Sequence, residues 1–67
     1  MQRFRLTIRK TEVSHQVVEL DAPNVVQASV RGDRFIDGQR RGVTVVQPFD
    51  DDSRASELLE VIAVKEA

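Results

Sequence analysis

Basic side chains recur at alternate positions near the start of the chain, and they are the residues best suited to chemistry with a charged partner. Arg3, Arg5 and Arg9 alternate with apolar residues, which places all three on one side of a strand. Arg40 and Arg41 form a second basic spot in a loop bounded by glycines. Guanidinium groups bind carboxylates and phosphates through paired hydrogen bonds. We therefore expect these five arginines to contact an acidic or phosphate-bearing surface.

Three consecutive carboxylates, Asp50, Asp51 and Asp52, supply the opposite charge. They do not fit a calcium-binding loop, because counting from Asp50 puts Arg54 at the fifth position and Ala55 where that loop requires glycine. We expect no metal site here. The run is either an ordinary solvated loop or a contact for a basic partner, and we include it among the partner-binding residues.

Catalytic chemistry has little support in the sequence. His15 is the only histidine, and the chain has no cysteine or tyrosine. A nucleophile and its base must lie within hydrogen-bonding distance, whereas Ser14 and His15 are expected on opposite faces of a strand. A domain of this size also has little room for a cleft. We predict no enzyme activity, no catalytic residue and no cofactor.

The hydrophobic pattern predicts the elements that carry these residues. Residues 4–8 alternate apolar and polar, which indicates a strand with one apolar side. Residues 10–14 are mainly polar and predict a turn, after which the alternation resumes up to Ala22. The two strands can therefore pair as an antiparallel hairpin. The apolar side of this hairpin consists of Phe4, Leu6, Ile8, Val18, Leu20 and Ala22.

A helix is expected directly after the hairpin. Pro23 cannot lie inside a helix, and the Asn24 side chain can accept hydrogen bonds from the first free backbone amides. Gly38 can adopt the left-handed conformation that closes a helix, which gives a span of residues 24–37. Gly32 either allows close contact with the strands or ends the helix early. The predicted apolar stripe consists of Val25, Ala28, Gly32, Phe35 and Ile36, widened by Val26 and Val30.

The second half of the chain completes a sheet. Residues 43–46 are rich in β-branched side chains and predict a third strand, which Pro48 ends. The tail, residues 57–66, fits either a helix capped by Ser53 or a strand, and we favour the strand because its last residues have strand composition. The expected fold is α+β in ββαββ order, an antiparallel sheet with one helix packed on one face, in a single domain over residues 1–67.

Composition indicates the oligomeric state and the cellular location that we expect for such a domain. A chain of 67 residues without cysteine has a small core and no disulfide support, which favours self-association, so we expect a homodimer. No apolar run reaches the length of a membrane span or signal peptide, so we expect a cytoplasmic protein without membrane contact. Residues 1–41 carry a net charge of +3 and residues 42–67 carry −4, so the two parts attract each other within the fold or across a dimer.

Nucleic acid is the main alternative partner. A sheet face bearing Arg3, Arg5, Arg9 and His15 could follow a phosphate backbone. Proteins that bind single strands on such faces add aromatic side chains on which bases stack, and this face has none. We therefore rank nucleic-acid binding below protein binding.

Residues 3–37 run from two alternating strands straight into an A-x-x-x-x-x-A segment, Ala22 to Ala28, and a short helix. This order resembles a plan common among small proteins of phages and other mobile elements. Some of them are accessory proteins and some inhibit host defence, including certain anti-CRISPR proteins. The resemblance implies a non-enzymatic interaction module, an accessory protein or inhibitor that occupies a surface of a larger protein or nucleoprotein.

Two alternatives stay open. The chain is a small nucleic-acid-binding regulator that uses the basic sheet face, or it is a structural homodimer whose fourth strand completes the partner's sheet.

Overall fold

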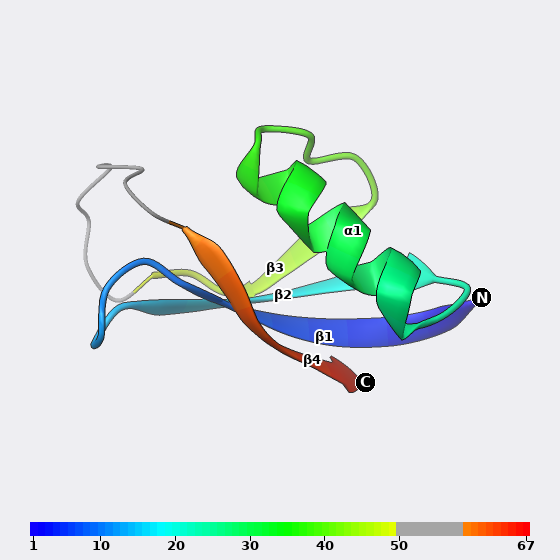
Figure 1. Cartoon of the computed structure of the whole chain (residues 1–67), viewed down its shortest axis with the longest axis horizontal. Helices are drawn as coiled ribbons and strands as arrows, with labels where there is room; N and C mark the ends of the chain where they lie inside the picture. Colours follow the sequence, from blue (N-terminus) through cyan, green and yellow to red (C-terminus); the bar gives the residue numbers. More distant parts are fainter. Residues whose placement is uncertain (50–58) are drawn as a thin grey trace.

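A computed structural model describes residues 1–49 and 59–67 of the chain. It consists of a four-stranded antiparallel sheet with one helix packed across one face (Figure 1). The elements, in chain order, are β1 (Gln2–Arg9), β2 (His15–Ala22), α1 (Val25–Ile36), β3 (Val43–Gln47) and β4 (Glu60–Glu66). The strands lie side by side in the order β3-β2-β1-β4. The α+β class and the ββαββ order are confirmed, and the described part of the tail is a strand.

The β1–β2 hairpin supplies most of the core. Its turn is closed by the Lys10 amide, which donates to the Ser14 carbonyl over 3.0 Å. Phe4 then pairs with Leu20, and the six apolar residues predicted to share one side of the hairpin are all buried on the side that α1 covers. The buried core consists of Phe4, Leu6, Ile8, Val18, Leu20, Ala22, Ala28 and Phe35.

Both ends of α1 are closed by the residues that the sequence indicates. The Asn24 side chain accepts a hydrogen bond of 2.9 Å from the Gln27 amide, which satisfies one of the free donors of the first turn. Asp37 is the last, capping residue. Gly38 follows with a φ of 107°, a conformation that glycine adopts without steric cost, and its amide donates to the Phe35 carbonyl.

The buried stripe of α1 is narrower than the sequence pattern predicts. Ala28, Gly32 and Phe35 are buried, whereas Val25 is 52% exposed and Val26 is 65% exposed. Small residues at the contact bring the helix axis close to the sheet, so only a narrow face meets β4, β2 and β1. The inclusion of the outer valines in the stripe was therefore wrong.

At Gly32 the backbone of α1 lies directly against the side chains of the sheet, and the helix continues through it to Ile36. A Cβ atom at this position would overlap Leu6 Cδ2 and lie 3.1 Å from Val61 Cγ2. Of the two roles considered for this glycine, close contact is therefore the observed one.

We predict that Gly32→Ala destabilises the fold. Alanine improves helix propensity by about 1 kcal/mol, but the added methyl group must displace the fully buried Leu6 side chain, and such overpacking costs about 1–3 kcal/mol. We expect a net loss of up to about 2 kcal/mol in the free energy of unfolding, measured by urea denaturation and circular dichroism. Asp33→Ala is the control, since Asp33 is exposed on the same helix. A Gly32→Ala protein as stable as Asp33→Ala would contradict the close-packing explanation.

Candidate interaction surface

The helix leaves one face of the sheet uncovered, and we call it the open face. It carries the residues of each strand that alternate with the core positions. The three arginines predicted to share one side of the first strand, Arg3, Arg5 and Arg9, lie on it. Its central residues are Arg3, Arg5, Thr7, Val17, Glu19, Asp21, Thr44 and Ala63.

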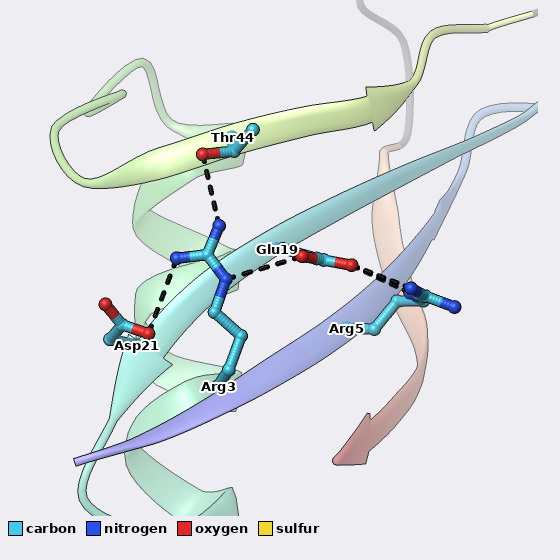
Figure 2. Close-up of polar contacts among 5 residues, drawn as sticks. All are labelled: Arg3, Arg5, Glu19, Asp21 and Thr44. Carbon is cyan, nitrogen blue, oxygen red and sulfur yellow. Dashed lines mark hydrogen bonds and ion pairs between the residues drawn. The ribbon is translucent and has the colours of Figure 1, made fainter. Parts of the chain in front are cut away.

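Arg3 is bonded to both neighbouring carboxylates of β2. Its Nε lies 3.4 Å from Glu19 Oε1 and its Nη1 lies 3.4 Å from Asp21 Oδ1 (Figure 2). Nη2 donates to Thr44 Oγ1 over 3.3 Å, so the guanidinium group also reaches β3. All three nitrogens of this side chain therefore have partners within the chain.

Glu19 is shared between two arginines. Arg5 donates to Glu19 Oε2 from Nε over 3.0 Å and from Nη2 over 2.8 Å, while Arg3 contacts the other oxygen (Figure 2). The Glu19 side chain is only 17% exposed, the lowest of any member of the described ion pairs. The hydrogen bonds from Arg5, followed by those from Arg3 and the charges of both groups, hold the pKa of Glu19 below its usual range despite partial desolvation.

Charge on the open face is nearly balanced. Arg9 forms an ion pair with Glu60 of β4, which joins the basic first part of the chain to the acidic last part. The charged residues of this face in the described part of the chain are Arg3, Arg5, Arg9 and Lys65, against Glu19, Asp21 and Glu60. The basic side predicted for the first strand therefore becomes part of a face with both signs of charge, because the adjacent strands supply carboxylates opposite the arginines.

The side chains in the middle of the open face are small and weakly polar. Thr7 of β1 pairs with Val17 of β2 on one side and with Ala63 of β4 on the other, so the three form a row across the sheet. All three are partly buried by their neighbours. We call them the central row. It lies between the charged network of Arg3 and Arg5 and the ion pair of Arg9.

The second predicted basic spot lies elsewhere. Arg40 is in the segment between α1 and β3, and its guanidinium carbon is 5.1 Å from the centre of the Phe35 ring, on the helix side of the sheet. This cation–π contact holds Arg40 away from the open face. Arg41 is exposed in the same segment. The structure therefore does not bring these arginines together with those of β1, and the predicted contacts Asp50, Asp51 and Asp52 lie outside the described residues.

Ser14 and His15 do not form a catalytic pair. Ser14 belongs to the turn rather than to a strand, where its amide donates to the Thr11 carbonyl and hydroxyl groups. It is 1% exposed, and its hydroxyl oxygen has no hydrogen-bond partner among the described residues. His15 begins β2 opposite Arg9. Residues 1–49 and 59–67 contain no group of three or more side chains that could hold a metal ion.

Comparison with known proteins found no matching family model, no matching curated protein and no matching solved structure. Within the described ranges, no helix is long and apolar enough to cross a membrane.

Sequence reasoning missed the two carboxylates that organise the open face. Glu19 and Asp21 were assigned to the second strand without partners, although a signal was present. A turn over residues 10–14 sets Arg9 opposite His15. Moving away from the turn along both strands of the hairpin, the same register sets Arg5 opposite Glu19 and Arg3 opposite Asp21. Thr44 gave no comparable signal, because its position depends on the pairing of β3 with β2.

We predict that Arg5 lowers the pKa of Glu19 more than Arg3 does. Arg5 donates two hydrogen bonds of 2.8 and 3.0 Å, whereas Arg3 makes one contact of 3.4 Å. In an NMR titration of the side-chain carboxyl group, Arg5→Ala should raise the pKa of Glu19 toward its ordinary value, and Arg3→Ala should raise it less. Equal shifts in the two variants would contradict the assigned order.

The same lowered pKa predicts how stability depends on pH. A carboxyl group with a lower pKa in the folded state stabilises the fold above its unfolded pKa, about 4.3 for glutamate, and loses that contribution as pH falls through the folded pKa. The urea midpoints of the wild type and Glu19→Gln should therefore differ at pH 7 and converge as the pH falls below about 4. A difference that stays constant over this range would show that ionisation of Glu19 does not contribute.

Proposed function

We propose that the protein is a non-enzymatic interaction module that binds a larger protein through the open face of its sheet. The observation that carries this proposal is the central row of Thr7, Val17 and Ala63, which is partly buried and which no layer of residues 1–49 or 59–67 covers. Protein interfaces combine a core poor in charge with a polar rim in which arginine is enriched. The central row has the character of such a core, and the ion-paired arginines around it have the character of such a rim.

The ion pairs favour a rigid contact surface. Arg3 and Arg5 are held by Glu19 in the free protein, so less side-chain entropy is lost when a partner docks. A partner surface with mixed charge can meet this rim without removing the internal pairs. Arg9 and Glu60 provide the same arrangement on the other side of the central row.

Nucleic acid has weaker support as the partner. Phosphate binding needs cations whose charge is not already neutralised, and Arg3 uses three of its five N–H donors within the chain, two of them on carboxylates. Phe4 and Phe35 are buried in the core, and Phe49 is partly buried against it, so none of them offers a stacking platform on the open face.

The resemblance of residues 3–37 to small phage proteins supports an accessory protein or inhibitor, and a chain without cysteine suits the reducing cytoplasm. Arg40 and Arg41 are proposed contacts outside the open face, and Asp50, Asp51 and Asp52 are proposed contacts on the basis of the sequence alone.

We predict that Val17→Lys abolishes tight partner binding. Lysine would put a charge at the centre of the contact, where truncation of key residues commonly costs 2 kcal/mol or more. The partner is first identified by affinity capture from the native host with the wild-type protein, and binding is then measured by biolayer interferometry. We expect a loss of at least about tenfold in affinity, equivalent to about 1.4 kcal/mol.

Val26→Lys is the matched control for this experiment. Val26 is 65% exposed on α1, on the side of the sheet away from the open face, so its variant should bind like the wild type. Circular dichroism confirms that both variants fold. Unchanged binding by Val17→Lys, with a loss in Val26→Lys, would move the contact to the helix and overturn the proposal.

The nucleic-acid alternative has its own test. Fluorescence anisotropy with labelled single-stranded and duplex DNA and RNA at low salt should show no saturable binding at micromolar protein. Saturable binding that weakens steeply with salt and is lost in an Arg3→Ala, Arg5→Ala double variant would favour the alternative.

A further inference from the structure

The strand β3 forms one edge of the sheet, and its apolar side chains are unusually exposed for an edge strand. It pairs with β2 on one side, and in the described part of the chain no strand lies on its other side. Its five residues, Val43–Gln47, include no charged residue and no proline. Val45 is 42% exposed and Val46 is 49% exposed. Backbone groups and apolar side chains are therefore available together, which natural edge strands usually avoid.

The opposite edge also exposes an apolar side chain, Ile62, at 45%, but it differs in charge and in the regularity of its pairing. β4 carries Glu60, Lys65 and Glu66, and its pairing with β1 is interrupted by a bulge between Thr7 and Ile8. Charges and bulges are the common means by which proteins prevent unwanted strand addition. β3 also has a bulge, opposite Val17 and Val18, but Val43, Thr44 and Val45 pair regularly with β2. One edge is thus protected and the other is not.

We propose that β3 pairs in antiparallel orientation with β3 of a second copy of this chain, which joins the two sheets into one continuous sheet. This inference goes beyond the proposed function, because it concerns the sheet edge and not the open face. Antiparallel pairing of a strand with itself generates a two-fold axis, here at or near the central residue Val45. Such an interface is closed, which is the commonest arrangement in soluble homo-oligomers.

Charge order along the sequence favours this occupant and this orientation. Arg40 and Arg41 precede β3, and Asp50, Asp51 and Asp52 follow it. Arg40 and Asp50 each lie five positions from Val45. In sequence order alone, an antiparallel second copy sets the basic residues before β3 against the acidic residues after it, whereas a parallel copy sets like charges against each other. A foreign strand has no such complementarity built in.

The pairing also accounts for the size of the assembly. Once the two β3 strands have paired, the only outer edges left among the described strands are the two copies of β4. Since these edges are charged and bulged, further strand addition is disfavoured and the assembly stops at two chains. A five-residue strand makes a small interface, so we expect a dimer that dissociates on dilution through the micromolar range.

The first test places a charge on the edge. Val45→Lys should raise the dissociation constant of the dimer at least tenfold, measured by sedimentation equilibrium over a concentration series, because lysine on an edge strand opposes pairing. Val13→Lys is the control, since Val13 is 82% exposed in the β1–β2 turn and is not part of the outer edge of β3. A wild-type protein that is monomeric at millimolar concentration, or a Val45→Lys dimer as tight as the wild type, would overturn the proposal.

The second test does not depend on the stability of a charged variant. The chain has no cysteine, so a single introduced cysteine can only cross-link to its copy. Facing residues of antiparallel strands have Cα atoms about 4.5–5.5 Å apart, within the range that a disulfide spans. Under mild oxidation Val45→Cys should form covalent dimers several-fold faster than Val13→Cys. Equal rates for the two variants would contradict pairing through β3.

The experiments can disprove the proposed open-face contact and the proposed dimer independently of each other. Val17→Lys changes the open face and leaves the outer edge of β3 intact, so it should sediment as a dimer like the wild type. If Val17→Lys is monomeric while Val45→Lys is dimeric, the self-association surface is the open face and the edge proposal is wrong.

Discussion

The register of the β1–β2 hairpin is the constraint on which the rest of the structure depends. The turn sets Arg9 opposite His15, and the same register sets Phe4 opposite Leu20 and Arg5 opposite Glu19. Because side chains alternate along a strand, a slip of one residue would turn one strand's charges toward the core. A single register therefore builds the apolar layer under α1 and pairs the charges on the other side of the sheet. Core burial and charge pairing select the same arrangement.

The position of α1 follows from small residues at its contact. Gly32 lowers helix propensity by about 1 kcal/mol relative to alanine, yet it lets the helix rest directly on Leu6 and Val61. Close approach makes the covered area narrow, so the outer valines of the helix and Val45 of β3 stay exposed. The helix that completes the core thus also determines which surfaces are left for other molecules.

Local patterns predicted most of this fold, and nonlocal pairing accounts for what they missed. Two-residue periodicity identified the strands and the buried side of the hairpin, and Asn24 and Gly38 marked the helix ends, because these signals depend on neighbouring residues alone. Strand order, the two bulges and the stacking of Arg40 on Phe35 depend on segments far apart in sequence. The carboxylate partners of Arg3 and Arg5 lie on the neighbouring strand, but they could be predicted from the sequence, because the length of the β1–β2 turn sets the register of the hairpin.

Internal pairing of charge changes what the surface can recognise. A face with nearly equal numbers of cations and carboxylates produces a weak long-range field, so it gains little from electrostatic steering of a distant partner. Affinity must then come from contacts made at short range, through apolar atoms and backbone groups. Among the described residues these are concentrated in the central row and along the β3 edge. In the complexes proposed above, the arginines of β1 would act mainly by orienting the surface around the central row, and specificity would depend on the fit of that row and that edge.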